Sequence, residues 1–162
     1  MRSLRENAMA DTRVQLEVED WVRREWMPKM FGQSFFGERV NLSSGGVFLF
    51  DAVSVDHKVV ATISTSEATT ATGKNAVGKQ MKLRSDMYFL LLAKADKRAV
   101  VLTEKSMYDW WAKEAERGRV HRDIEFFYAM IPGDLDVRLR ASRKRASMEV
   151  TPGEVDTSAA SD

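Results

Sequence analysis

The stretch 45–82, GGVFLFDAVSVDHKVVATISTSEATTATGKNAVGKQMK, contains the strongest structural signals in the chain. An apolar run at 47–50 ends at the carboxylate Asp51, and a β-branched run returns over 59–65. The polar residues between the two runs, with Asp56 and His57 at their centre, predict a tight antiparallel turn. A Gly- and Thr-rich loop then carries lysines toward a helix. This stretch therefore predicts a buried hairpin with one acid at its edge, followed by a basic loop.

The residues before the hairpin predict a helix over 12–31. Thr12 and Gln15 have the spacing of a capping box, and apolar residues then recur at helical intervals. We expect the helix to end at Gly32, which suits the left-handed terminal position, or to kink or stop earlier at Pro28. Residues 35–42 predict a short strand that precedes the hairpin.

Helices and strands alternate after the hairpin. Residues 66–75 predict a loop, and 76–93 a helix. We expect its apolar stripe to contain Val77, Met81, Tyr88, Leu91 and Leu92. The next elements are a buried strand at 98–103, an amphipathic helix at 106–117 and a strand at 124–131. Residues 135–146 fit a strand by alternation and a helix by longer spacing, and we favour a helix because the segment follows Pro132.

Composition is typical of one globular domain. The chain has 162 residues, is 44% hydrophobic and 30% charged, and has a formal net charge of only +1. It contains no cysteine, which excludes disulfides and thiolate metal sites. It shows neither a secretory signal nor the roughly 20 apolar residues that span a bilayer, so we expect no membrane partner and a cytoplasmic location. We divide it into a flexible N-terminal arm (1–11), one α/β domain (12–150) and a disordered tail (151–162).

Strands bracketed by helices predict an α/β fold with a mixed central sheet flanked by helices. This order, together with the hairpin residues, resembles the PD-(D/E)XK nuclease-like, or restriction-endonuclease-like, superfamily over roughly 14–103. The resemblance places the first acid at a bend of the second strand, where Asp51 stands, and makes Asp51 the expected metal ligand. It places an acid and a lysine, one residue apart, on the third strand. Those positions hold Thr62 and Ser64 here, so the motif is degenerate.

In such nucleases the carboxylates hold Mg²⁺ and the lysine helps to activate the attacking water. Thr62 and Ser64 supply hydrogen bonds but no charge. The resemblance allows the lysine or the acid to migrate to the following helix, and Lys82 is the preferred cation. Glu67 is the preferred replacement acid, with Glu38 and Glu17 as alternatives.

Two basic segments are candidate nucleic-acid contacts. The first lies in and after the loop and the second in the last predicted helix, and their residues are Lys74, Lys79, Arg138, Arg143, Lys144 and Arg145. Charge runs of this kind also occur as solvated faces with no ligand. Residues 73–80 also match the P-loop spacing, but Gln80 replaces its Ser or Thr and a loop separates it from the strand.

Three functions follow from these observations. The first is a metal-dependent endonuclease or phosphodiesterase, with Mg²⁺ as cofactor, built on Asp51 with migrated partners. The second is a catalytically silent relative that still binds DNA or RNA. The third is a nuclease-fold module that interacts with protein partners. The near-neutral net charge favours the third, the basic segments favour the second, and Asp51 supports the first.

Overall fold

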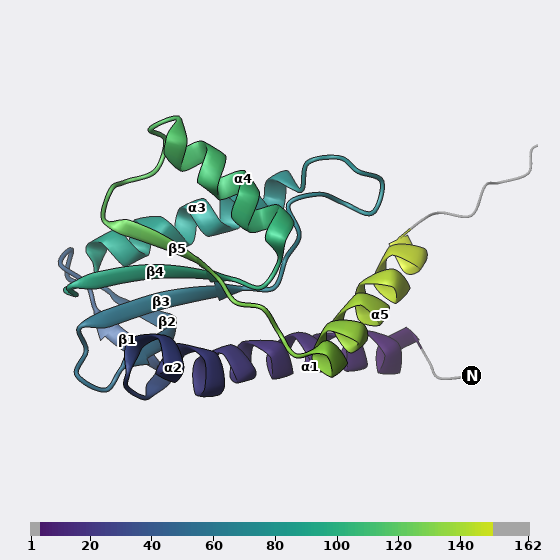
Figure 1. Cartoon of the computed structure of the whole chain (residues 1–162), viewed down its shortest axis with the longest axis horizontal. Coiled ribbons are helices and arrows are strands. Elements are labelled where there is room, and N and C mark those ends of the chain that lie inside the picture. The colour runs from purple at the N-terminus through teal and green to yellow at the C-terminus, as the bar shows by residue number, and fades with distance from the viewer. Residues whose placement is uncertain (1–3, 151–162) are drawn as a thin grey trace, which may run out of the picture.

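A computed structural model describes residues 4–150 of the chain (Figure 1). Its centre is a five-stranded sheet in the order β1-β2-β3-β4-β5. The first three strands form an antiparallel meander, whereas β3, β4 and β5 run parallel through crossover helices. The strands are β1 (Phe35–Asn41), β2 (Val47–Ser54), β3 (Val59–Ser64), β4 (Lys97–Leu102) and β5 (Ile124–Tyr128). The predicted mixed α/β sheet is confirmed.

Helices cover both faces of the sheet (Figure 1). One face packs against a continuous helical segment made of α1 (Leu4–Trp21), a π-helical turn η1 (Val22–Trp26) and α2 (Met27–Phe31). The other face is covered by α3 (Val77–Leu92) and α4 (Lys105–Glu116), whose buried Trp111 stacks on Phe126. The last helix, α5 (Gly133–Val150), leaves the sheet and packs on α1.

The ends of the chain differ in part from expectation. The first helix begins at Leu4 and not near Thr12, so residues 4–11, which we expected to form a loose arm, are helical. Pro28 does not stop the helical segment: the π turn η1 comes directly before α2, and Pro28 lies in the first turn of α2. Gly32 ends α2 with a φ of 73°, as predicted, and 133–150 is helical, as favoured. The tail at 151–162 lies outside the described residues.

The apolar stripe that we predicted for α3 is wrong in its first three residues, whereas Leu91 and Leu92 are partly buried against the core. Val77, Met81 and Tyr88 are 57%, 45% and 60% exposed. The buried stripe contains Leu83, Met87 and Leu90 together with Gln80. The buried stripe is hard to recognise in the sequence because it includes the polar residue Gln80. The Gln80 side-chain amide is buried and donates a hydrogen bond to the Ala68 carbonyl of the preceding loop, at 3.1 Å.

We expect Leu90→Ala to lower the free energy of unfolding by about 2–5 kcal/mol, because Leu90 is fully buried and its truncation leaves a cavity. Met81→Ala, on the face first expected to be buried, should change it by less than about 0.5 kcal/mol. Urea unfolding of the two variants measures both values. Equal destabilisation by the two changes would contradict the observed orientation of α3.

Candidate functional site

Asp51 lies at an irregularity of β2. Glu38 pairs with Phe50, but Phe36 pairs with Val53, so β2 carries one more residue than β1 between these pairs. Such a bulge bends the strand and re-aims a side chain. Gly37 faces the extra residue, and a Cβ there would lie 3.7 Å from the Asp51 carbonyl. The local sequence thus turns Asp51 out of the regular alternation of the sheet.

The Asp51 carboxylate bridges two strands where their ladder is interrupted. β2 and β3 share backbone pairs only at Ala52 and Val53. Next to these pairs, Oδ2 of Asp51 accepts the Ile63 backbone N–H at 2.8 Å and the Thr62 hydroxyl at 3.0 Å. Nε of Arg23, in η1, donates to the Asp51 carbonyl at 2.6 Å. Three elements therefore fix the position of this acid.

A second carboxylate meets Asp51 at the same hydroxyl. Oδ2 of Asp86, on α3, lies 3.4 Å from Oγ1 of Thr62 and 3.0 Å from Nζ of Lys82. A hydroxyl has one proton to donate, so Thr62 can satisfy only one of the two acids at a time. Lys82, which pairs with Asp86, supplies the cation that the resemblance expects on this helix.

A third acid, Glu19 of α1, faces the same region. It lines a cavity of about 160 Å³ together with Ser64, Lys79, Lys82 and Asp86. Burial raises the pKa of Glu19, the charge of Asp51 raises it further, and Arg23 and Lys82 oppose this rise. The sequence analysis missed Glu19 and Asp86. Glu17, named from the sequence as an alternative acid, lies two residues from Glu19 on another side of the helix.

The structure does not bring the predicted replacement acids to Asp51. Glu17 pairs with Arg138 of α5 at 2.7 Å, and Glu38 pairs with His57 at 3.2 Å. Glu67 lies 3.7 Å from Arg143. These pairings hold elements together and leave Asp86 and Glu19 as the acids near Asp51. Thr62 and Ser64 do belong to the site, the first by contact with both aspartates and the second at the cavity wall.

The predicted basic residues separate into two groups. Lys79 lines the cavity, and Lys74 lies in the exposed loop before α3. Arg138 is paired with Glu17, while Arg143 donates to the Thr65 carbonyl and to Glu104, the latter at 2.9 Å. These two arginines dock α5 on the rest of the protein. Lys144 and Arg145 are exposed further along α5.

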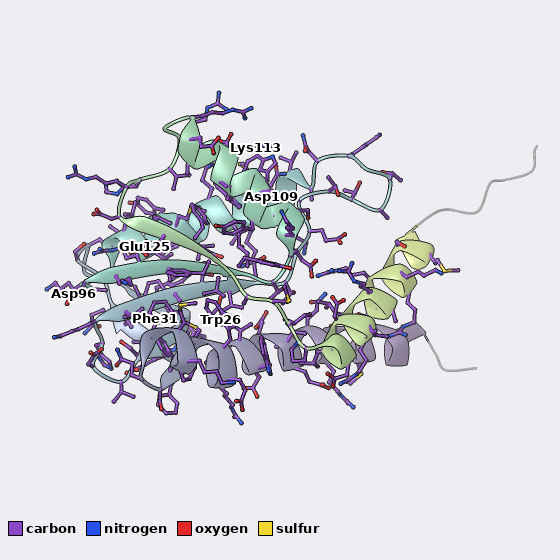
Figure 2. All side chains as sticks on the ribbon, viewed as in Figure 1. Trp26, Phe31, Asp96, Asp109, Lys113 and Glu125 are labelled. Atoms are coloured by element: carbon purple, nitrogen blue, oxygen red, sulfur yellow. The ribbon has the colours of Figure 1, made fainter. Side chains whose placement is uncertain are left out.

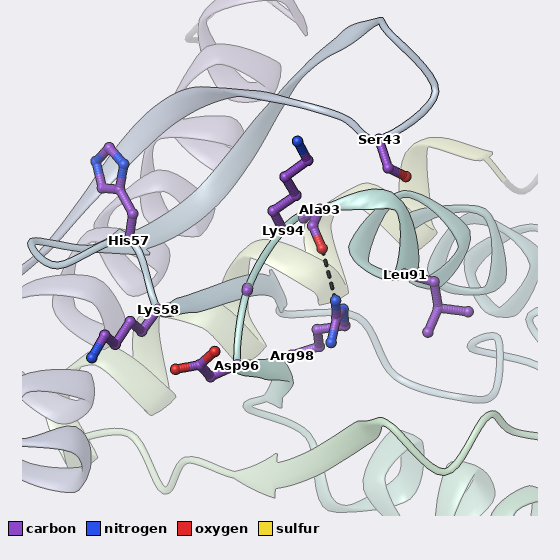
Figure 3. A pocket seen from close by; sticks show the side chains of 9 residues that line it. Ser43, His57, Lys58, Leu91, Ala93, Lys94, Asp96 and Arg98 are labelled. Atoms are coloured by element: carbon purple, nitrogen blue, oxygen red, sulfur yellow. Dashed lines mark hydrogen bonds between the residues drawn. The ribbon is translucent and has the colours of Figure 1, made fainter.

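A second hollow, larger than the cavity beside Glu19 and Asp86, lies away from these acids. It measures about 520 Å³ and is formed at the opposite end of β3 by the turns around Ser43, His57 and Lys94 (Figure 3). Its arginine, Arg98, is committed to the carbonyls at the end of α3, donating to Leu90 and Ala93 at 2.8 and 2.7 Å. Figure 3 shows the Lys94 side chain extending away from Asp96, so the charged groups that line the hollow do not converge on one point.

Comparison with known proteins finds no matching family model, curated protein or solved structure. Within residues 4–150, no three His, Asp or Glu side chains are arranged to hold a metal ion. In the same residues, no helix is long and apolar enough to cross a membrane. The case for function therefore rests on the geometry around Asp51.

We expect Glu19→Gln to stabilise the protein at pH 7.5. The pKa of Glu19 is raised in the folded state, so the folded protein binds the proton more tightly, and the ionised carboxylate costs stability above that pKa. The gain should disappear at about pH 4, where both states carry the proton. Thermal or urea unfolding at the two pH values measures it.

Glu17→Gln, on the same helix, is the matched control with the opposite sign. The hydrogen bond from Arg138 lowers the pKa of Glu17, so its charge stabilises the fold at neutral pH, and this contribution is lost as the pH falls through the lowered pKa. The substitution should destabilise the protein at pH 7.5 and have less effect in acid. Effects of the same sign for both variants would refute this assignment of the two glutamates.

Proposed function

We propose that the protein is nuclease-like and interacts with DNA or RNA, and that the pocket around Asp51 hydrolyses phosphodiester bonds with a divalent metal ion. One observation carries the proposal. A second carboxylate, Asp86, converges with Asp51 on the hydroxyl of Thr62, and a lysine, Lys82, pairs with Asp86. They match the acid, acid and cation that the resemblance implies, with two of the three on α3 in place of β3.

The topology supports the same proposal. The resemblance implies a helix, three strands, a helix and a strand, with the first acid at a bend of the second strand. The chain has α1, the β1–β3 meander, α3 and β4 in that order, and Asp51 stands at the bulge of β2. Strand order and the position of one acid support the fold. The proposed hydrolysis is supported by the side chains that converge near Asp51.

The residues fit a sparsely held Mg²⁺. No hydrogen bond from the described residues reaches Oδ1 of Asp51 or Oδ1 of Asp86, since the donors to both acids meet Oδ2. Mg²⁺ is commonly bound by one or two carboxylates, with waters and substrate phosphate oxygens completing its shell. Asp51 and Asp86 would hold the ion, which when bound supplies Lewis acidity and lowers the pKa of a coordinated water.

The other side chains of the pocket have separate roles. Thr62 and the Ile63 N–H orient Asp51, and Asp86 holds the Lys82 ammonium at the cavity, where it neutralises phosphate charge. Burial raises the pKa of Glu19, which is the direction in which a carboxyl group is tuned to act as a general acid. Lys79, exposed at the cavity mouth, is placed to contact the nucleic-acid backbone.

A second function, a catalytically inactive nuclease-fold module that engages a protein partner, is favoured by one specific observation. The Asp51 carboxylate joins β2 to β3 through the Ile63 N–H, so the fold alone explains why an acid stands there. The charged pair expected on β3 is also replaced by Thr62 and Ser64.

The test is a cleavage assay on labelled single- and double-stranded DNA and RNA, with and without Mg²⁺ or Mn²⁺, at two salt concentrations. We expect metal-dependent cleavage that falls about 10²-fold or more in Asp86→Asn, because this change removes a charge at the site but leaves the Asp51 bridge intact. Asp109→Asn is the matched control, since Asp109 is an exposed partner of Lys105 on α4.

Two results would reject catalysis. Cleavage that is equal in Asp86→Asn and Asp109→Asn would place the activity elsewhere or in a contaminant. Binding that weakens with salt, without cleavage by any metal, would indicate a silent nucleic-acid binder. Neither binding nor cleavage would leave the protein-interaction module as the function.

A further inference from the structure

Three arginines converge on one buried carboxylate on the α4 side of the molecule. The Glu114 side chain is 6% exposed, and Arg84 of α3 donates to its Oε2 at 3.0 Å. Arg117 and Arg119, from the turn after α4, each donate to Oε1 at 3.3 Å. The group, which we call the Glu114 cluster, combines three guanidinium charges with a single carboxylate. It therefore carries excess positive charge at one point.

Arg84 is the structural member of this cluster. Besides its bond to Glu114, it donates to the Arg119 carbonyl at 3.0 Å, and its guanidinium lies 4.9 Å from the ring centroid of the buried Trp111. It joins α3 to the turn after α4 and by itself neutralises the buried carboxylate. The fold therefore needs neither of the other two guanidinium groups to pair Glu114.

Glu114 positions the Arg117 and Arg119 side chains but uses only part of their hydrogen-bonding capacity. Their side chains are 60% and 63% exposed, and within the described residues each makes one hydrogen bond to Glu114. A guanidinium has five N–H donors in a planar fork, so most of these donors face solvent. The attraction of a helix C-terminus for cations explains why one or two basic residues lie near the end of α4, but not why they point at the same atom.

We propose that the Glu114 cluster is a phosphate-binding site in which Arg117 and Arg119 grip the anion. Paired guanidiniums bind phosphate oxygens through parallel, charge-assisted hydrogen bonds, and Glu114 fixes both forks before the ligand arrives. The phosphate belongs either to a nucleic-acid backbone or to a free phosphate or pyrophosphate, because both present the same oxygens.

This site is separate from the pocket around Asp51. Arg84 and Lys82 are two residues apart on α3, which rotates their side chains by about 200° around the helix. One points to Glu114 and the other to Asp86, so the helix stands between the two sites. The inference therefore does not rest on catalysis at Asp51.

The test compares phosphate binding to the full chain and two matched variants. Arg117→Gln/Arg119→Gln removes both gripping charges and leaves the Arg84–Glu114 pair to maintain the fold, which thermal unfolding verifies. Arg122→Gln is the control, because Arg122 is 93% exposed nearby and lies 4.0 Å from Asp123. The probes are inorganic phosphate, pyrophosphate, and short single-stranded and duplex DNA, titrated by calorimetry without divalent metal at low salt.

We expect the double variant to bind the recognised probes about tenfold or more weakly, and Arg122→Gln to bind within about twofold of the wild type. Binding of pyrophosphate and DNA alike supports the site with either source. DNA binding alone assigns it to a nucleic-acid backbone, and pyrophosphate binding alone to a small phosphate ligand. Equal loss in both variants, or no binding of any probe at millimolar concentration, would overturn the proposal.

Discussion

The structure depends on one hydrogen bond from backbone to side chain, between the Ile63 N–H and the Asp51 carboxylate. It extends the junction between β2 and β3 beyond their backbone pairs at Ala52 and Val53, at the residue where β2 bulges against β1. The same bond aims the acid at Thr62 and, through that hydroxyl, at Asp86. One carboxylate thus joins two strands and shares the Thr62 hydroxyl with Asp86, so its structural role and its proposed chemical role depend on the same contacts.

The sequence was a good guide to the sheet and a poor guide to the partners of Asp51. The hairpin was predictable because apolar runs of the right length flank a polar turn. The acids were not, because Glu19 and Asp86 reach the pocket only through the rotation of two helices about their axes. That rotation is set by buried contacts such as the one from Gln80 to Ala68, which replaces an apolar residue in the expected pattern. Glu67 is close to the site in the sequence, but its side chain lies beside Arg143 of α5.

Two arginines of α5 pair with partners that their position in the sequence does not suggest. Arg143 and Arg138 belong to a run of basic residues that reads as a solvent-facing or nucleic-acid-facing surface, yet both pair with acids far away in the chain and attach α5. The acid of one such pair, Glu104, is itself nearly buried, and burial raises its pKa against the lowering effect of Arg143. The net charge is near neutral, and charged side chains such as these pair with one another and connect separate elements of the fold.

The contact between α1 and α5 also orders events during synthesis. The Arg138–Glu17 pair joins residues 121 positions apart, and the apolar residues Val14 and Val18 of α1 pack with Leu139 of α5. A ribosome releases α1 long before α5, so for most of translation these valines have no partner. The strands of the sheet, which are closer to one another in the sequence, can assemble during this time. The part of α1 that packs on α5 cannot be buried until α5 has been synthesised. This arrangement makes the nascent chain, and not the finished protein, the form most exposed to aggregation or chaperone capture.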